Sequence, residues 1–376
     1  MPQTGEISAA SRIAALLVKV LCMFKRRGHS EKHKTLPVTL VVHAGAGNIL
    51  KQKMTYEEEE QLRAGISQAI DCGYAILRND GLAIDAVEAS VRSLENNPLF
   101  NAGKGAVFNR DGINQLEASI MDGNLGAAGA ATLLTTVKNP ITLARKVMES
   151  NFHVFLCGPG AESYAKEQGL DIVDPSYFWT RHRWEQHERG YIHNKPLTTG
   201  NSGSSSLTTV ASATLADSKH KGYLDLPMGT VGAVAIDANG YMAAATSTGG
   251  MSNKWDGRIG DSPVIGAGTF ANKSVAVSST GAGEYFIRQG TARYIALRMQ
   301  LLGESSDQAC KAAMSEMKAS GGDGGVICIS ADGYPSMVFC SAGMYRGYCS
   351  QSTKHIPVIG IFGDEKIAPG DIHIKL

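Results

Sequence analysis

The fold of this chain is indicated most clearly by residues 226–236, which read LPMGTVGAVAI. The small and β-branched residues from Val231 to Ile236 predict a buried strand. A polar segment rich in Ser, Thr, Gly and Asn precedes this run at residues 198–206. Thr230 therefore stands where a flexible segment meets a strand, although an ordinary loop-to-strand junction has the same features.

The chemistry of Thr230 favours a second interpretation, in which the chain cuts its own Gly229–Thr230 peptide bond. A Thr hydroxyl is a poor nucleophile until a base takes its proton, and a free α-amine on the same residue can be that base. The pKa of an α-amine is about 8, close enough to neutral for this task. We therefore expect Thr230 to be the catalytic nucleophile at the start of a β chain, residues 230–376, and the α chain to end at Gly229.

The composition excludes several other functions. The 376 residues carry a formal net charge of +1, so no basic excess is available to neutralise the phosphates of a nucleic acid. The seven cysteines are odd in number and form no C-x-x-C pair, which predicts reduced thiols and a cytoplasmic protein rather than a zinc site or a disulfide framework. No P-loop motif occurs, and the glycine-rich turn after Val42 lacks the dinucleotide-binding spacing. We therefore expect no cofactor.

Three segments differ in character along the chain. Residues 1–36 predict a flexible N-terminal extension; its apolar run, Ile13–Phe24, is too short to span a membrane and contains Lys19. Organelle targeting by this extension is left open. Residues 37–376 predict a single domain. Within it, residues 174–228 lack periodicity and predict a flexible linker, with one short helix at Arg181–Arg189.

Strands and helices alternate in blocks in the remainder. Helices are predicted at Tyr56–Arg78, Ala83–Leu94, Pro140–Ser150, Ala161–Gly169, Glu284–Leu302 and Ser306–Ala319. Strands are predicted at Val38–Val42, Ala106–Asn109, Leu116–Met121, within Gly123–Val137, and at Val154–Leu156, Val231–Ile236, Met242–Thr248, Ser262–Gly266, Val275–Thr280, Val326–Ile329, Ser336–Phe339 and Val358–Phe362. Hairpins dominate this order, which predicts a layered α+β fold rather than a doubly wound parallel sheet.

Two short blocks after Thr230 carry polar side chains suited to a substrate. The predicted hairpin brings Thr248, at the end of the second strand, within reach of the Thr230 hydroxyl. Arg258 and Asp261 stand three apart in a glycine-punctuated turn. An Arg can bind a carboxylate through two hydrogen bonds and an Asp can accept from an ammonium group, and an amino acid carries both groups on its α-carbon. A surface Arg–Asp pair is the alternative.

A third block, residues 278–284, lies at a predicted strand-to-helix junction. There the hydroxyl of Thr280 and the amide N–H of Gly281 can donate to an oxyanion. Ordinary capping of a helix N-terminus is the alternative. The loop Asn96–Gly105 is also polar and glycine-rich, so it can line a pocket or simply lie on the surface.

Taken in order, these blocks resemble the plant-type L-asparaginase/isoaspartyl (β-aspartyl) peptidase family of the N-terminal nucleophile (Ntn) hydrolases. The resemblance runs from about Val38 to Phe362. Its markers are His43–Gly47, Phe100–Gly103, Ala118–Gly123, Gly229–Gly232, Thr246–Gly250, Gly257–Pro263 and Ser279–Gly281.

The resemblance implies a four-layer αββα sandwich that cleaves itself between Gly229 and Thr230 and assembles as an (αβ)2 dimer. It implies hydrolysis of L-asparagine and β-aspartyl dipeptides. The implied roles are Thr230 as nucleophile, Thr248 as its orienting partner, Arg258 and Asp261 as ligands of the substrate α-carboxylate and α-ammonium, Thr280 and Gly281 as the oxyanion hole, Asn101 as a residue near the site, and the backbone of the Leu94–Gly103 loop as a structural sodium site.

Three alternatives remain at this level. Glycosylasparaginases and taspase-like threonine proteases share the fold, but we expect Asp before the nucleophile in both, where this chain has Gly229. The third alternative is a catalytically silent, amino-acid-binding protein, in which the Gly229–Thr230 bond stays intact.

Overall fold

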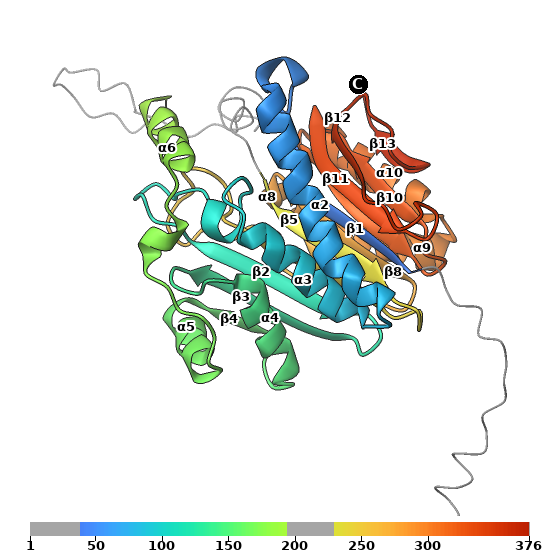
Figure 1. Cartoon of the computed structure of the whole chain (residues 1–376), viewed down its shortest axis with the longest axis horizontal. Helices are drawn as coiled ribbons and strands as arrows, with labels where there is room; N and C mark the ends of the chain where they lie inside the picture. The colour runs from blue at the N-terminus through green and yellow to red at the C-terminus, as the bar shows by residue number, and fades with distance from the viewer. Residues whose placement is uncertain (1–37, 194–228, 376) are drawn as a thin grey trace, which may run out of the picture. The chain divides into compact units, whose positions relative to one another are not determined.

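The computed structural model describes residues 38–193 and 229–375, and its centre is a pair of β-sheets (Figure 1). The first sheet has eight strands in the order β12-β11-β1-β5-β6-β2-β3-β4. Their bounds are β1 Thr39–Gly47, β2 Leu116–Asp122, β3 Ala127–Leu134, β4 Phe155–Cys157, β5 Val231–Ile236, β6 Met242–Thr248, β11 Gly343–Ser350 and β12 Val358–Phe362. The second sheet has five, in the order β13-β10-β9-β8-β7. Their bounds are β7 Thr269–Ala271, β8 Val275–Gly281, β9 Gly324–Ser330, β10 Pro335–Phe339 and β13 Gly370–His373.

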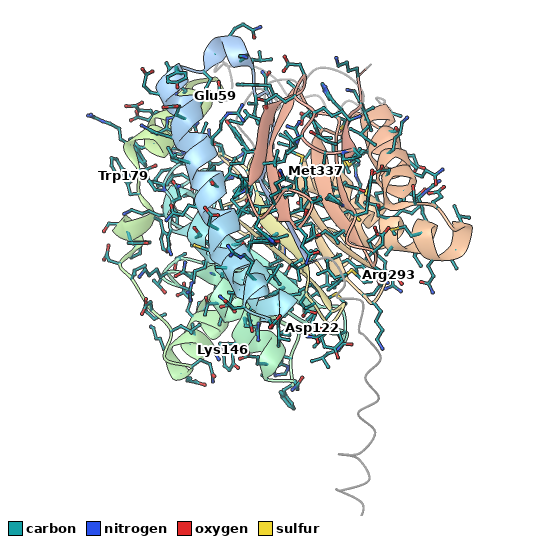
Figure 2. The ribbon with its side chains drawn as sticks, turned by 45° about the vertical axis from the view of Figure 1, so that its right-hand side comes forward. Glu59, Asp122, Lys146, Trp179, Arg293 and Met337 are labelled. Atoms are coloured by element: carbon teal, nitrogen blue, oxygen red, sulfur yellow. The ribbon has the colours of Figure 1, made fainter. Side chains whose placement is uncertain are left out.

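Helices contact the two sheets separately. Four pack on the first sheet: α2 Tyr56–Arg78, α3 Ala83–Glu95, α4 Pro140–Glu149 and α5 Gly158–Glu167. Two others, α9 Thr291–Leu302 and α10 Ser306–Ala319, pack on the second sheet, next to α8 Gly283–Gln289. The remaining helices are α6 Arg181–His193 and the short 3-10 helices η1 Lys51–Lys53, η2 Gly103–Gly105 and η3 Pro175–Phe178. Figure 2 shows Met337 among strands that lie between α2 and the orange C-terminal helices. The predicted α+β class is confirmed.

The strand sequences explain the layering, because alternate side chains of a strand point to opposite faces. On β5, Val231, Ala233 and Ala235 join the apolar cluster beneath α2 and α3. Val234 and Ile236 join a second cluster, which lies between the two sheets. Since β5 is buried on both faces, its sequence is apolar throughout.

The topology puts Thr230 at the middle of the first sheet. Strand β5 pairs antiparallel with β1 on one side and with β6 on the other. Thr230 directly precedes β5 and is 6% exposed. A new chain end at this position would therefore start inside the molecule, at the edge of the space between the sheets.

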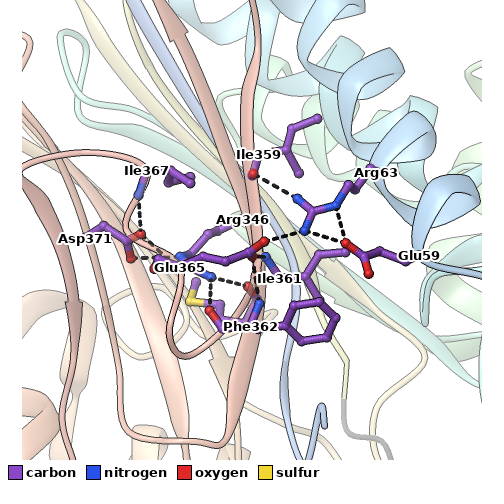
Figure 3. Close-up of polar contacts among 10 residues, drawn as sticks. Glu59, Arg63, Arg346, Ile359, Ile361, Phe362, Glu365, Ile367 and Asp371 are labelled. Atoms are coloured by element: carbon purple, nitrogen blue, oxygen red, sulfur yellow. Dashed lines mark hydrogen bonds and ion pairs between the residues drawn. The ribbon is translucent and has the colours of Figure 1, made fainter. Parts of the chain in front are cut away.

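A buried ion pair joins the C-terminal strands to the rest of the chain. Arg346 of β11 is fully buried and donates from Nε and Nη2 to the two carboxylate oxygens of Asp371 on β13, at 2.7 and 2.8 Å. Its Nη2 also donates to the carbonyl of Glu365 at 2.6 Å, and the Glu365 carboxylate pairs with Arg63 on α2. Figure 3 shows this chain of contacts running from β13 to α2. We call these four residues the Arg346 cluster.

Two predicted strands are wrong. Residues 106–109 form only isolated bridges, Phe108 with Asn114 and Asn109 with Lys254, and β2 pairs with β3 and β6 instead of with them. Residues 262–266 turn because the Asp261 carbonyl accepts from the amides of Val264 and Gly268. The next strand, β7, begins only at Thr269.

The predicted helix 284–302 is two helices. The chain breaks between α8 and α9 at Gly290, whose φ is 61° and is therefore left-handed. A residue in that conformation ends a helix, and Gly adopts it without the penalty of a Cβ atom.

The predicted linker is folded in its first part, contrary to the prediction for Asp174 onward. The 3-10 helix η3 buries Phe178, and α6 confirms the predicted short helix and extends it to His193. Residues 194–228 and the predicted extension 1–36 lie outside the described residues. Within the two described ranges, no helix is both long and apolar enough to cross a membrane.

Candidate active site

The Thr230 hydroxyl lies beside Thr248, as the hairpin predicts. The β5–β6 register pairs Val231 with Ser247, so Thr230 and Thr248 come opposite each other at the end of the hairpin. Thr230 Oγ1 donates to Thr248 Oγ1 at 3.3 Å, and the amide of Gly250 donates to the same oxygen at 2.9 Å. The Thr248 proton is therefore directed away from Thr230.

The Thr248 hydroxyl donates its proton to the carbonyl oxygen of Gly229, in the Gly229–Thr230 peptide bond. Thr248 Oγ1 donates to it at 3.1 Å and Asn101 Nδ2 donates to it at 2.6 Å. The Asn101 amide cannot turn freely, because its Oδ1 accepts from the amide of Val107 at 2.9 Å. Two fixed donors on one carbonyl stabilise negative charge on that oxygen, which is what attack on the Gly229 carbon would create.

A small pocket opens next to this bond. It brings together most of the residues that the sequence predicts: Gly229, Thr230, Thr248, Arg258, Asp261 and Gly281 line it, together with Glu117, Gly250, Met251 and Ser262. Gly229 itself takes up part of the opening.

Opposite charges face this pocket. Arg258 donates from Nε and Nη2 to the Glu284 carboxylate at 2.9 and 3.0 Å. Asp261 is 3% exposed, and its Oδ2 has no hydrogen-bond partner among the described residues. Burial raises the pKa of Asp261 to about 7, although the nearby Arg258 opposes the shift. An ammonium group of a ligand would supply the missing partner.

The end of β8 contributes a second unpaired polar atom. Thr280 is fully buried, and its Oγ1 has no hydrogen-bond partner within residues 38–193 and 229–375. The neighbouring Gly281 has a φ of 144°, and a Cβ there would lie 2.3 Å from the Asp323 carbonyl oxygen. Buried polar groups are normally paired, so the Thr280 hydroxyl is left with a hydrogen bond to make, although Gly281 and not Thr280 lines the pocket.

A hydroxyl chain beneath Thr230 has no counterpart in the sequence predictions. His43 Nδ1 lies 2.9 Å from the Thr230 carbonyl oxygen and its Nε2 lies 2.9 Å from Ser278 Oγ. Burial lowers the pKa of His43 to about 3, so the ring is neutral. Because the carbonyl can only accept, Nδ1 carries the proton and Nε2 accepts from Ser278. The chain continues through the hydroxyls of Thr246 and Thr269.

Two further charged residues support the pocket. Glu117, 1% exposed on β2, accepts from the amide of Gly260 at 3.1 Å and from Thr132 Oγ1 at 3.1 Å. Lys254 donates to the carbonyls of Gln115 and Gly249, and burial lowers its pKa to about 8. A carboxylate near the start of the mostly apolar predicted strand Leu116–Met121 is the sequence signal that could have indicated Glu117.

The Leu94–Gly103 loop and the adjoining glycine turn gather carbonyl oxygens. A Cβ on Gly103 would lie 2.3 Å from the Glu95 carbonyl oxygen, and a Cβ on Gly105 would lie 2.1 and 2.6 Å from those of Phe100 and Pro98. The two glycines therefore let these backbone carbonyls approach the chain more closely than a side chain would allow. Oxygen ligands of this kind suit a hard cation such as sodium.

An α+β fold with a Thr hydroxyl beside a polarised carbonyl at the start of a central strand is an arrangement suited to hydrolysis. The chain belongs to the asparaginase family, because the family model described as "Asparaginase" matches residues 36–359. It is 42% identical over 330 residues to an isoaspartyl peptidase of Escherichia coli, covering 87% of this chain and 96% of that protein.

Two other relatives agree. The chain is 42% identical over 327 residues to an isoaspartyl peptidase of Salmonella typhimurium, covering 86% of this chain and 98% of the relative. It is 36% identical over 344 residues to an isoaspartyl peptidase/L-asparaginase of Danio rerio, covering 90% and 99%. The family resemblance predicted from the motifs is confirmed, and the chain is an amidohydrolase of this family.

Proposed function

We propose that this chain is a self-cleaving hydrolase of L-asparagine and β-aspartyl (isoaspartyl) dipeptides, with Thr230 as its N-terminal nucleophile. The observation that carries the proposal is the arrangement at Gly229–Thr230. A Thr hydroxyl and the carbonyl before it share Thr248 as a hydrogen-bond partner, and Asn101 donates to that carbonyl as well. The names of the relatives supply the substrate class.

Self-cleavage begins with attack of Thr230 Oγ1 on the Gly229 carbonyl carbon. Asn101 and Thr248 stabilise the oxyanion. The C–N bond then breaks as the Thr230 nitrogen takes up the proton that Oγ1 has lost, and an ester joins Gly229 to the Thr230 side chain. Water hydrolyses this ester, which releases the Gly229 carboxylate and leaves Thr230 with a free α-amine and a free hydroxyl.

In the mature protein the same hydroxyl attacks the substrate. The α-amine of Thr230 takes the hydroxyl proton while Thr248 orients the oxygen. Arg258 binds the substrate α-carboxylate, Asp261 binds its α-ammonium, and Thr280 and Gly281 donate to the oxyanion. Ammonia or the downstream amino acid leaves with the proton, and water hydrolyses the β-aspartyl ester to aspartate.

Four further properties belong to this proposal. The fold is the αββα sandwich of the Ntn hydrolases, supported by helices that contact the outer faces of two facing sheets. The cleaved chains assemble as an (αβ)2 dimer, which light scattering would test. A structural sodium ion binds the Leu94–Gly103 loop. The protein is cytoplasmic, supported by the free thiols of all six described cysteines, unless residues 1–36 direct it to an organelle.

The decisive experiment compares wild type with Thr230→Ala. Purified wild-type protein should give two fragments on a denaturing gel, whereas Thr230→Ala should remain one chain of 39.8 kDa without asparaginase activity. Thr230→Ser, which keeps a hydroxyl, is the matched control and should still cleave. If Thr230→Ala also splits after Gly229, the assignment of the nucleophile is wrong.

The alternatives have distinct outcomes. Turnover of a glycosylated asparagine would indicate a glycosylasparaginase, and cleavage of a protein after Asp would indicate a taspase-like protease. A catalytically silent binding protein would keep the Gly229–Thr230 bond intact and still bind aspartate. Gly at position 229 and the close identity to isoaspartyl peptidases favour the proposed function over all three.

A further inference from the structure

Helix α6 makes a polar contact with the loop that carries Asn101. Arg183 on α6 donates from Nε to the carbonyl of Gly105 at 2.8 Å and from Nη2 to the carbonyl of Leu99 at 3.3 Å. These carbonyls lie on either side of Asn101 in the chain. One guanidinium group therefore holds both ends of the loop from which Asn101 projects.

The same helix holds a second loop of the site. His187 Nδ1 donates to Asn253 Oδ1 at 2.5 Å, and Asn253 Nδ2 donates to the His187 carbonyl at 3.3 Å. Asn253 has a φ of 57°, a left-handed conformation that needs support in a residue other than Gly. Its neighbour Lys254 donates to the carbonyl of Gly249 at 3.0 Å.

The two loops meet at the peptide bond before Thr230. Asn101 Nδ2 donates to the carbonyl of Gly229 at 2.6 Å and to that of Gly250 at 2.7 Å. The amide of Gly249 donates to the Asn101 carbonyl at 3.1 Å. A displacement of either loop would therefore move the Asn101 amide relative to the Gly229 carbonyl, and 1 Å is enough to matter for such a donor.

The electrostatics of Arg183 indicate a role beyond packing. The residue is 6% exposed, and burial lowers its pKa to about 10. No carboxylate of the described residues forms an ion pair with it; its partners are backbone carbonyls and the side chain of Gln186. Burying a cation without an anion costs free energy, which its hydrogen bonds have to offset. The hydrogen bonds of Arg183 hold the loop that carries Asn101.

We propose that Arg183 is a positioning residue for self-cleavage, which acts through Asn101, and that α6 is the element that aligns the Gly229 carbonyl for attack. This inference rests on the self-cleavage proposed above. The inference gives a function to α6, a segment that the sequence predicts to be part of a linker.

The test measures the rate of self-cleavage in Arg183→Met, which removes the donors but keeps a long apolar side chain. Arg181→Met is the matched control, because Arg181 lies on the same helix with an 87% exposed side chain and only a 3.8 Å ion pair to Glu185. We expect at least a tenfold slower conversion of precursor to fragments in Arg183→Met, wild-type conversion in Arg181→Met and an intermediate rate in Arg183→Lys. The assays are run well below the Tm of every variant.

A double-mutant cycle with Asn101→Ala separates positioning from general destabilisation. If Arg183 acts through Asn101, the double variant should cleave no more than twofold slower than Asn101→Ala alone. Rate losses that multiply, or wild-type cleavage in Arg183→Met, would overturn the inference. His187→Ala goes through the same cycle, so the inference stays testable if Arg183→Met does not fold.

The controls also separate this inference from the proposed function. If the wild-type chain never cleaves, the proposed function fails first. If the wild type and Arg183→Met cleave at equal rates, the proposed function stands and only the role of α6 is refuted.

Discussion

Single atoms decide whether the site can form, and Gly232 is the clearest case. A Cβ at this position would lie 2.1 Å from Ser278 Oγ and 2.4 Å from His43 Nε2. The hydrogen bond between His43 and Ser278 therefore passes through the space that any other side chain would fill. Gly232 therefore lets the two sheets approach closely enough for His43 to contact Ser278. Because His43 also donates to the Thr230 carbonyl, this close approach helps to hold Thr230 in place.

Gly232→Ala should accordingly lower the free energy of unfolding by about 1–3 kcal/mol, the usual effect of overpacking a core. It should also slow self-cleavage, because the His43 ring has to move. Urea denaturation of the precursor form, made in the Thr230→Ala background, measures the first effect. Adding Ser278→Ala removes the clashing Oγ and should restore part of the stability; a Gly232→Ala chain as stable as its parent would contradict the expectation.

The raised pKa of Asp261 predicts a pH-dependent affinity for amino acids. A carboxyl with a pKa of about 7 gains its charge as the pH rises through 7, and only the charged form pairs with an ammonium group. The Kd of L-aspartate for the cleaved protein should therefore rise about tenfold per unit as the pH falls from 7 to 5. Calorimetric titration measures this directly. Asp261→Asn should bind weakly at every pH, and a similar slope in that variant would show that another group titrates.

At the scale of elements, the junction between α8 and α9 depends on Gly290. Its left-handed φ of 61° costs about 1–2 kcal/mol for a residue with a Cβ. Gly290→Ala should therefore destabilise the protein by about 1 kcal/mol in thermal or chemical denaturation. Gly160 on α5 is the matched control, because a Cβ there meets nothing within 4 Å and its φ is not left-handed. Gly160→Ala should leave the stability unchanged or raise it.

Local signals in the sequence predict the helices well. Helix α2 runs from Tyr56 to Arg78 as predicted, because Thr55 and Glu58 form a capping box at its start and the chain turns at Asn79. In the predicted helix Glu284–Leu302, the helical periodicity of apolar residues continues through Gly290. A single Gly within such a pattern does not reveal that its φ is left-handed. The sequence therefore predicts one helix where the structure has two.

Strands depend on distant partners, so the sequence predicts them less completely. Strand β11 is absent from the predictions because its segment contains Arg346 and two glycines, which are poor strand residues in isolation. In the fold, β11 pairs with both β1 and β12, and Asp371 neutralises the Arg. The hydroxyl chain escapes prediction for a similar reason, since it forms through contacts between the two sheets. The role of Glu117 follows from its contacts with Thr132 on the neighbouring strand β3 and with the distant Gly260 amide.

The site shows what the sequence can and cannot predict. Each predicted residue that lines the pocket lies in a short block whose spacing and residue types indicate its chemistry; these residues are Thr230, Thr248, Arg258, Asp261 and Gly281. Their roles remain predictions until the variants are made. The contact from α6 to the Asn101 loop could not be predicted, because a helix rich in Arg and His has no apolar face that would indicate where it docks.

At the scale of the whole molecule, the Arg346 cluster links both sheets to α2 (Figure 3). Arg346 belongs to the first sheet, Asp371 to the second, and Glu365 passes the contact to Arg63. The guanidinium also lies 4.7 Å from the centre of the Phe339 ring. The Arg346–Asp371 ion pair therefore attaches strand β13 to the first sheet, together with the hydrogen bond from His373 to the carbonyl of Gly363, which follows β12.

Asp371→Leu should lower the free energy of unfolding by about 3–5 kcal/mol, because it leaves the Arg346 charge buried without its anion. Guanidinium chloride denaturation provides the measurement. The double variant Arg346→Met with Asp371→Leu replaces the pair by apolar side chains and should recover most of the loss. If the double variant is less stable than Asp371→Leu alone, the cost lies in the remaining contacts of Arg346 and not in the unpaired charge.

Gly229 lines the pocket, so cleavage of the Gly229–Thr230 bond would change the lining of that pocket. If the bond breaks as proposed, the new carboxyl end starts in a pocket that Arg258 also lines, and residues 194–228 still join it to α6. A tethered anion has a high effective concentration, so it would compete with the first substrate molecules. Activity should consequently lag behind scission, and the lag should shorten as asparagine is added, because the substrate and the severed end compete for the same pocket.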